Sequence, residues 1–476
     1  MPMGSFRMDD TLRMQRIMPI LGLCFVFAVL GCASLQNYTL KVEPARTSIM
    51  QGNFEGALNA FPEKEAKGKD EILLRLERAM ILQDLGRFDQ SSAEFDKAFA
   101  RFRENQDKAV ISASGTVSEA GTLLINEQVM PYEGQDFEII LLHALDAVNY
   151  LMRGDLEGAR VEVRKSYEQQ DQLLEKHEGE LRKAQSDNRS SEWEQSFDRA
   201  DRRGYEQLKE KASTVVSLYE NAFASYISAL VYELGGEYDD AYIDLKKAYQ
   251  AYPTCRSLQR DLVRLSKKTG FREDRAMWEE RFGKFKAGPK EGTDVFVIFS
   301  YGLAPYKVPV TFPIPTSHGF VFASLPVYEF SRSPIHGGLV VSDGISEDTS
   351  TVFDVDAVAA RNLLDDFPIL FVKQIARSYI KAKATSQLSH RQGDIGAIIG
   401  TLFSAVTERA DLRAWSTLPK QIQVARLFVP RSSTEISLEA LPAGGISVVE
   451  IPRGASHVII YCRATENGLA TYTKSF

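Results

Sequence analysis

The sequence predicts a multidomain protein in which an all-α superhelix of repeated helix pairs is followed by an α+β domain with short antiparallel strands. Three observations support this fold class. A glycine-containing pattern recurs along residues 45–253, a linker-like run follows at residues 287–292, and short apolar runs bounded by turn residues occupy 293–476. The 476 residues exceed one ordinary domain, and an apolar fraction of 44% is normal for chains that bury real cores.

The chain begins with features of an export signal. Arg13 and Arg16 precede an apolar run at 17–30, whose 14 residues are too few for a permanent membrane span and suit a signal peptide. Two aspartates upstream are unusual in such a segment, so translation from Met8 or Met14 is an alternative start. We expect this segment to be removed.

The apolar run ends in Val-Leu-Gly-Cys at residues 29–32, which resembles the lipobox of bacterial lipoproteins. The resemblance implies a signal peptide at residues 1–31 and a diacylglycerol on the thiol of Cys32. With three acyl chains in all, such an anchor is stable, because one chain alone binds a membrane only marginally. Ala33 stands where an aspartate would imply inner-membrane retention, so the resemblance implies the outer membrane, with the protein facing the periplasm.

Charge and cysteines narrow the possible partners. Processing removes three arginines and two aspartates, so the net charge goes from −7 to −8, which argues against a nucleic-acid partner and against polybasic contact with a membrane. Cys255 and Cys462 then remain besides Cys32. We expect two buried thiols, because a disulfide would require the two predicted domains to dock closely.

The repeat is built around glycines and small residues. The spacing from Gly52 to Gly86 is 34 residues, the pattern returns two periods later at Gly154, and its best example follows Gly236. Pro253 closes that last unit. An alanine stands seven residues before each glycine, at Ala45, Ala79, Ala147 and Ala229.

This pattern resembles the tetratricopeptide repeat, which implies stacked antiparallel helix pairs across residues 32–286. Glycine permits the tight turn, small residues allow close helix approach, and proline ends a helix. The first unit is degenerate, since Pro62 shortens its second helix. An unrelated helical bundle is the alternative. Stacked pairs enclose a concave groove for protein partners, and the resemblance places Gln83, Leu151 and Glu233 in that groove.

Two segments interrupt the repeats. Residues 103–136 are rich in Ser, Gly and Ala and are interpreted as a diverged helix pair. Residues 168–211 are dominated by charged and amide side chains, which predicts an exposed helical hairpin or a partly disordered arm. Whether it is a hairpin or an arm, the second segment is compatible with a solvent-exposed region that has no function of its own.

The second half, 293–476, alternates strand and helix patterns. Helical periodicity is expected at 356–384 and 394–408. Strands are expected at 295–299, 306–312, 319–323, 327–330, 421–429, 447–451 and 457–463. The domain is interpreted as short strands around one or two helices, finishing as a small β-sandwich. The glycines of 393–400 favour a tightly packed helix over a phosphate loop, because no lysine follows as in a Walker motif.

One local cluster is a candidate ligand site. Its members are the charged residues and the tryptophan of one short segment, Glu408, Arg409, Asp411, Arg413 and Trp415. The carboxylates could act as a pair, or the arginines and tryptophan could bind an anion or a sugar. The alternative is a salt-bridge cluster at a helix end with a packing tryptophan.

The sequence does not favour an enzyme. The six histidines are isolated, and no His-Glu-x-x-His, Cys-x-x-Cys or Gly-x-Ser-x-Gly motif occurs. We therefore expect neither metal nor cofactor.

The features together resemble outer-membrane lipoproteins with tetratricopeptide-like N-terminal halves. The leading hypothesis is a lipid-anchored periplasmic scaffold for protein partners of the cell envelope, such as its assembly or peptidoglycan-synthesis machinery. The rival is a periplasmic hydrolase or glycan-binding protein that uses residues 408–415.

Overall fold

A computed structural model describes residues 38–113, 130–185, 203–216, 218, 220–285, 292–316, 319–392, 410–442 and 444–476. The predicted signal peptide and Cys32 lie outside these residues, and so do most of the predicted linker at 287–292 and the whole helix predicted at 394–408.

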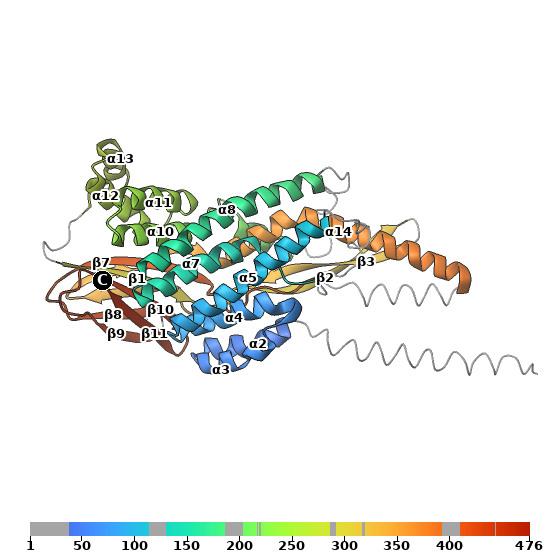
Figure 1. Cartoon of the computed structure of the whole chain (residues 1–476), viewed down its shortest axis with the longest axis horizontal. Coiled ribbons are helices and arrows are strands. Elements are labelled where there is room, and N and C mark those ends of the chain that lie inside the picture. Colours follow the sequence, from blue (N-terminus) through green and yellow to red (C-terminus); the bar gives the residue numbers. More distant parts are fainter. Residues whose placement is uncertain are drawn as a thin grey trace, which may run out of the picture.

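The first half consists of helices paired through turns of two or three residues (Figure 1). The described pairs are α2 (Tyr38–Met50) with α3 (Phe54–Asn59), α4 (Glu71–Asp84) with α5 (Phe88–Ala113), α7 (Asp136–Arg153) with α8 (Leu156–Gln185), α10 (Ala222–Leu234) with α11 (Tyr238–Ala251), and α12 (Arg256–Thr269) with α13 (Arg272–Phe282). The single-turn 3-10 helices η1 (Glu63–Glu65) and η2 (Gly68–Asp70) precede α4. The helix-pair architecture is therefore as the repeat predicts.

The glycines of the repeat stand in the turns and its alanines in the core. The four repeat glycines have φ between 69° and 81° and stand in the turns. Glycine is required at position 86 for two reasons: its φ is positive, and a Cβ atom there would lie 2.2 Å from the ring of Tyr472. The four alanines are buried in the helical core. Tyr252 separates the end of α11 from Pro253, and α3 ends at Asn59, before Pro62.

The helical half extends beyond the four predicted units. A fifth pair, α12 and α13, turns at Gly270, whose φ is 80°. Helix α5 runs into the first interrupting segment as far as Ala113, and α8 runs into the charged one as far as Gln185. The chain is helical again at 203–212, where Tyr205 and Leu208 are buried. The described parts of both segments thus prolong the array.

The second half forms two packed sheets and a separate hairpin. The strands are β1 (Gly292–Tyr301), β2 (Tyr306–Thr316), β3 (Gly319–Glu329), β4 (Gly337–Ser342), β5 (Ile345–Asp348), β6 (Ser350–Asp354), β7 (Gln421–Pro430), β8 (Glu435–Leu441), β9 (Ile446–Glu450), β10 (His457–Thr465) and β11 (Gly468–Ser475). One sheet has the order β11-β10-β1-β7-β6, the other β5-β4-β8-β9, and β2 pairs with β3.

The two sheets make the expected small β-sandwich. Alternate residues of β1, including Val295 and Val297, pack with residues of β8 and β10 in one core between the sheets. The intervening residues Phe296 and Ile298 belong to the core that β1 shares with the helices. Burial on both faces explains why β1 is a continuous apolar run rather than an alternating one.

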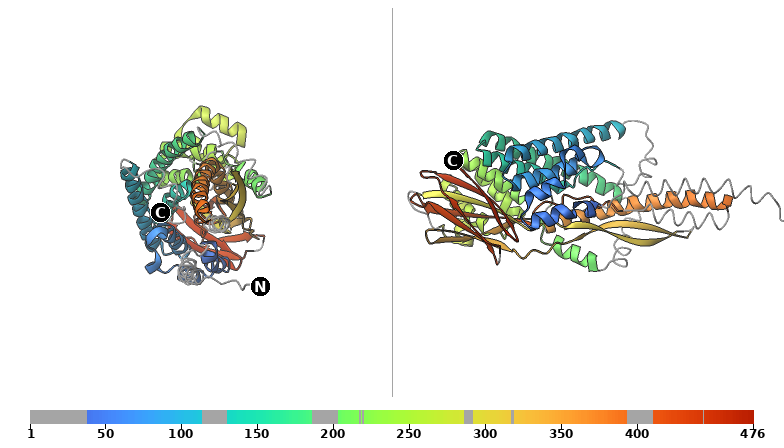
Figure 2. Two further views of the ribbon diagram at one scale, coloured as in Figure 1. Left: turned by 90° about the vertical axis from the view of Figure 1, so that its right-hand side faces the viewer. Right: turned by 90° about the horizontal axis from the view of Figure 1, so that it is seen from below.

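The helical array covers the outer face of the five-stranded sheet (Figures 1 and 2). Helix α7 contacts β10 and β11, α10 contacts β6, and α12 contacts β7. Apolar side chains from the helices and from β1, β7 and β10 belong to a single core. The two halves are therefore layers of one body.

Helix α14 (Val355–Gln392) and the β2–β3 hairpin extend away from this body side by side (right-hand view of Figure 2). Gln374 of α14 donates from Nε2 to the carbonyl oxygen of Ser324 in β3 at 3.0 Å. Among the described residues, no helix is long and apolar enough to cross a membrane.

Several strand predictions need correction. β1 and β10 pair in parallel, so the domain is not wholly antiparallel, and strands of ten and eleven residues are not short. The two strands predicted at 319–323 and 327–330 are one, β3, because Pro326 faces Pro309 where neither needs to donate an amide hydrogen. Strands β4, β5, β6, β8 and β11 were not predicted. The sequences of β4, β5, β6 and β11 are short or polar and carry no strong period. β8 does alternate, with Ile436 and Leu438 buried, and this signal was missed.

Candidate functional site

The inner face of the helical array, lined by α4, α7 and α10, is the surface at which the sequence predicts partner binding. In the structure this face holds the second half of the same chain. Buried carboxylates on three of its helices, Glu77, Asp84, Glu138 and Glu233, bind groups of the β-sandwich or of the segment just before β7. The geometry of these four contacts defines the site.

Glu77 of α4 holds the chain just before β7. Its Oε1 accepts hydrogen bonds from the amide and the hydroxyl of Ser416 at 2.9 and 2.8 Å, and its Oε2 accepts one from the amide of Thr417 at 2.8 Å. The hydroxyl of Tyr38 donates a fourth, also at 2.8 Å. The carboxylate is fully buried, and these four donors replace the water it loses.

Glu138 of α7 binds the same segment. Its Oε1 accepts a hydrogen bond from the amide of Trp415 at 2.8 Å, and its Oε2 accepts bonds from the hydroxyl of Tyr132 and from the amide of Gln135. Burial raises the pKa of Glu138, and these hydrogen bonds oppose the shift. Gln135 and Glu138 also form a capping box, so one carboxylate both caps α7 and binds the second half.

Asp84, at the end of α4, meets the five-stranded sheet. The hydroxyl of Tyr461 donates to its Oδ1 at 2.7 Å, and Nε of Arg463 lies 3.3 Å from its Oδ2. The hydroxyl of Tyr472 donates to the carbonyl oxygen of Asp84 at 3.1 Å. Burial raises the pKa of Asp84 to about 6, although Arg463 favours the charged form.

Glu233 of α10 belongs to a buried network of three carboxylates and two guanidinium groups. Arg426 of β7 donates to both oxygens of Glu233 at 2.9 and 2.8 Å, and Arg264 of α12 donates to the same oxygens at 2.6 and 2.7 Å. Arg426 also donates to Asp261 and to Asp294. Burial raises the pKa of Glu233, but the two arginines outweigh it and hold that pKa well below its usual range.

The helical half also contributes a buried cation that binds groups of the second half. Arg46 of α2 donates to the carbonyl oxygens of Ser416 and Ala304 at 2.6 and 3.0 Å, and to the hydroxyl of Ser331 at 2.7 Å. Burial lowers the pKa of Arg46. Charged groups from both halves are therefore satisfied only when the two are docked.

The predicted groove residues do not face an open groove, which corrects that prediction. Gln83 is buried and donates to Asn149 and to the carbonyl oxygen of Leu145, both at 2.8 Å, so it links α4 to α7. Leu151 is a fully buried core residue. Glu233 does lie on the inner face, but Arg426 occupies it. The concave surface is filled from within the chain, because the sheet needs a cover for its second apolar face.

The predicted ligand cluster is not assembled as a pocket by its described members. Glu408 and Arg409 lie outside the described residues. Arg413 forms ion pairs with Asp411 at 2.6 Å and with Asp70 at 2.9 Å. Trp415 is buried, with its ring centroid 5.9 Å from that of Phe95. The salt-bridge cluster with a packing tryptophan, which was the alternative, describes these residues, and it joins the two halves of the chain.

The cysteines are as expected. Cys255 and Cys462 are both free and buried. Cys462 points into the core between the two sheets, and Sγ of Cys255 lies 3.3 Å from the hydroxyl of Ser350. Burial raises the pKa of each thiol, which opposes reactivity.

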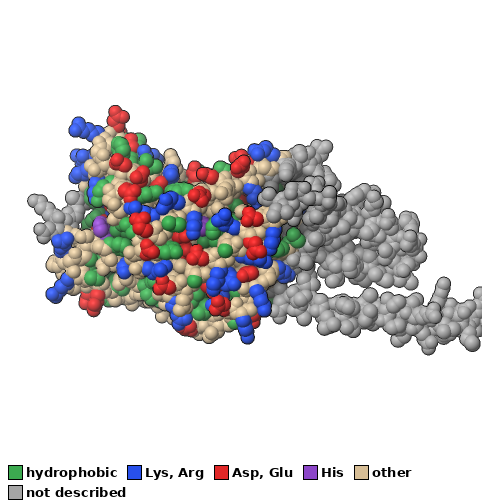
Figure 3. Space-filling view, in the orientation of Figure 1, with side chains coloured by type: hydrophobic (Ala, Val, Ile, Leu, Met, Phe, Trp, Pro, Cys, Tyr) green, Lys and Arg blue, Asp and Glu red, His purple; other side chains and the backbone are tan. Residues whose placement is uncertain are grey.

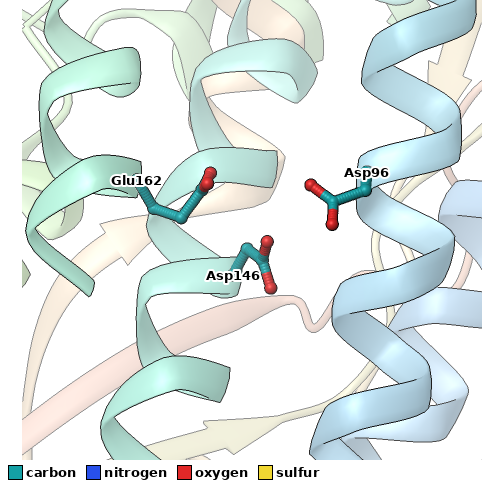
Figure 4. A group of neighbouring side chains, drawn as sticks. All are labelled: Asp96, Asp146 and Glu162. Atoms are coloured by element: carbon teal, nitrogen blue, oxygen red, sulfur yellow. The ribbon is translucent and has the colours of Figure 1, made fainter. Parts of the chain in front are cut away.

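An acidic group between α5, α7 and α8 is the arrangement among the described residues that could hold a cation (Figure 4). Asp96 of α5, Asp146 of α7 and Glu162 of α8 bring their carboxylate oxygens within 4.8 Å of one another. Protein side chains already occupy part of it, since Nδ1 of His143 and the ammonium group of Lys165 each lie 2.7 Å from Glu162. Burial, reinforced by Glu162, raises the pKa of Asp146 to about 7. A protonated Asp146 relieves the repulsion without a metal.

Sequence reasoning missed the residues that join the two halves. Arg426 and Arg463 are single charges inside apolar runs, and that isolation was the available signal. Glu77 stands beside Arg78, and Asp84 follows Gln83 at the end of α4, so neither carboxylate carries this signal. A lone charge in the apolar stretch of a helix or strand is rarely buried unless it is paired. The sequence does not say which distant group pairs with it.

The comparisons with known proteins add little to this picture. No protein-family model and no curated protein matches the chain. Two crystal structures of MamA are similar at 12% identity each. They cover 50% and 53% of this chain and 91% and 96% of their own, with TM-scores of 0.28 and 0.29. The TPR2AB domain of yeast Sti1, in complex with pHSP90, also has 12% identity over 50% of this chain and 87% of its own, with a TM-score of 0.19. Such scores are too low to establish a shared fold, so the architecture rests on the helices and turns described above.

Proposed function

We propose that this protein is a non-catalytic scaffold of the bacterial cell envelope. Cys32 carries its lipid anchor, the outer membrane holds it, and it faces the periplasm. Its helical array binds the β-sandwich of the same chain, and an external protein partner binds elsewhere on the surface. The observation that carries this proposal is the filled inner face, where helix carboxylates hold a folded domain through its backbone and its arginines.

The outer helices offer a surface for such a partner. Val161 of α8 and Ile243 of α11 are large apolar residues with exposed fractions of 43% and 46%. An ion pair between Arg160 and Glu237 joins the two helices. Side chains of both charges are interspersed over the face drawn in Figure 3, which suits a protein partner better than a polyanion.

The anchor is tested by replacing Cys32 with serine and comparing cell fractions. After a high-salt wash, which screens contacts with lipid headgroups, the parent should stay in the outer membrane and Cys32→Ser should be released into the periplasmic fraction. Mass spectrometry of the mature N-terminus should find a lipid-modified cysteine. An unmodified terminus would contradict the anchor.

The scaffold is tested in cells with a photo-crosslinking amino acid at position 161 or 243. Both positions should give the same discrete adduct with another envelope protein. Ile243→Asp should abolish the adduct from position 161 without changing the unfolding midpoint, because the side chain is exposed. Point substitutions test this surface more specifically than deletion of residues 40–260, because that deletion would also expose the sheet face that the helices bury. If neither position gives an adduct at native expression levels, this surface is not the partner site.

A further inference from the structure

Strand β9 is an edge of the four-stranded sheet, since β8 is the one described strand with which it pairs. Helices α7, α10 and α12 contact the five-stranded sheet, and the four-stranded sheet packs on the opposite face of that sheet (Figures 1 and 2). The helical array therefore lies on the far side of the sandwich from β9.

Two hydrogen bonds define which backbone groups of β9 face β8. The amide of Ile451 donates to the carbonyl oxygen of Thr434 at 2.8 Å, and the amide of Ala440 donates to that of Gly445 at 3.1 Å. In an antiparallel ladder, residues bonded to the neighbouring strand alternate with unbonded ones, and the register between these two bonds is continuous. The odd-numbered residues of 445–451 therefore face β8. The amide and carbonyl groups of residues 446, 448 and 450 point to the free edge.

The side chains of β9 leave this edge exposed and apolar. Ile446 and Val448 lie on the outer face of the sheet, with exposed fractions of 65% and 60%. Ser447 points inward, and its hydroxyl lies 2.9 Å from that of Thr471, so β11 lies beneath β9 rather than beside it. Residues 446–450 contain no proline, lysine or bulge, which are devices that protect edge strands. Such an edge is a template for a further strand.

The outer face of the same sheet is acidic. Glu435 lies opposite Glu450, Glu439 lies opposite Ile446, and Asp348 of β5 shares their face. No lysine or arginine occurs in β4, β5, β8 or β9, and the nearest arginines along the chain, at 431 and 453, belong to the adjoining turns. A strand with a basic side chain is therefore favoured here. Pairing of β9 with a second copy would bring two acidic faces together.

We infer that β9 is a docking edge to which another protein adds an extended strand. The added strand runs antiparallel to β9, as do all the described neighbours in this sheet. On the outer face it carries apolar side chains opposite Ile446 and Val448 and a lysine or arginine opposite Glu450. Backbone hydrogen bonds supply the affinity, and these side chains supply the selectivity. This contact goes beyond the proposed partner surface of Val161 and Ile243, and the two can fail independently.

The test uses the mature chain with Cys32→Ser and a synthetic, capped peptide of sequence Lys-Thr-Val-Thr-Val as the probe. In antiparallel pairing its lysine lies opposite Glu450 and its valines opposite Val448 and Ile446. In one version the threonine nitrogens are methylated, and their amides would point away from β9. In the matched version the lysine and valine nitrogens are methylated, and these would otherwise bond to β9. Fluorescence anisotropy should show about tenfold tighter binding of the first version.

Two matched pairs of variants locate the binding of the first peptide. Val448→Pro removes a donor from the free edge but none from the ladder with β8, so binding should weaken about tenfold. Its control is Ser346→Pro, in β5 at the other edge of the sheet, where the amide also points away from the neighbouring strand, and binding should not change. Glu450→Lys should weaken binding about fivefold, whereas Glu280→Lys, at an exposed position of α13, should not.

Three results would overturn the inference. The two methylated peptides bind equally or not at all, or Ser346→Pro weakens binding as much as Val448→Pro, or the chain without peptide sediments as a dimer that Val448→Pro dissociates. The last result would assign the edge to a second copy of the chain. The comparison of the two peptides uses the parent chain, so it decides the question even if a proline variant does not fold.

Discussion

Arg426, the one charged residue of β7, should contribute more to stability than an exposed arginine. All five N–H groups of its guanidinium are used: Nε donates to Asp294 at 2.9 Å, Nη1 to Glu233 and Asp261 at 2.9 and 3.1 Å, and Nη2 to Glu233 and Asp294 at 2.8 and 2.5 Å. Arg426→Met fills a similar volume but leaves three buried carboxylates with Arg264 as the one remaining arginine of the network.

The expected cost follows from that change of charge. With both arginines, the three carboxylates carry a net charge of −1, and without Arg426 they carry −2. Breaking a buried ion pair by removing one partner costs about 3–5 kcal/mol, because the other partner keeps its charge in a poorly solvated site. Arg426→Lys keeps the charge but cannot form the fork of bonds to Glu233 and Asp294, so it should cost less.

Urea unfolding of the Cys32→Ser chain, followed by circular dichroism, measures this loss. Arg431→Met is the matched control, since Arg431 follows the end of β7 and is exposed, and its effect should lie within about 0.5 kcal/mol. If Arg426→Met is as mild as Arg431→Met, the network does not hold the two halves together, and the interpretation of the inner face is wrong.

Three further predictions concern the titration of Asp146, the glycines in two helix turns and the two buried thiols. Burial raises the pKa of Asp146 to about 7 in the folded protein, well above that of a solvated aspartate, so the folded state holds a proton that the unfolded chain has released. The free energy of unfolding should therefore fall as pH rises from about 4 to about 7, and Asp146→Asn should flatten that decline in urea titrations at several pH values. Gly86→Ala should destabilise the protein much more than Gly236→Ala. Both glycines have φ above 60°, but only at Gly86 does the added Cβ overlap a tyrosine ring, and thermal melting should rank them so. Cys255 and Cys462 should resist alkylation in the native protein and react once urea unfolds it; modification of either thiol in the native state would mean that it is not buried.

A filled inner face changes how a scaffold of this kind would work. Glu77, Glu138 and Glu233 are engaged by the second half of the chain, so an outside partner would have to displace a folded domain and leave these buried charges unpaired. The large cost of unpaired buried charge favours partner binding on the outer helices or on the projecting elements instead. The array then serves to fix the sandwich, α14 and the hairpin in one orientation.

Much of the local structure could be predicted from the sequence. The turns at Gly52, Gly86, Gly154 and Gly236 follow from the backbone freedom of glycine, and the short α3 follows from Pro62. The strands β1, β7 and β10 follow from apolar runs of β-branched and aromatic residues. Polar or short strands such as β5 and β11 could not be predicted, because neighbouring strands rather than their own side-chain period stabilise them.

The helix pairs, the strands β1, β7 and β10 and the burial of both thiols could be inferred before any coordinates were known, because these features depend on local spacing and on side-chain polarity. The closure of the helical array on its own sandwich depends instead on the packing of the whole chain. Ser416 binds Glu77 across 339 residues of chain, and a charge in the sequence does not indicate which distant group will replace its water. The predicted groove residues are covered for the same reason. The apolar residues of a face show that it will be buried, but they do not show which part of the chain will bury it.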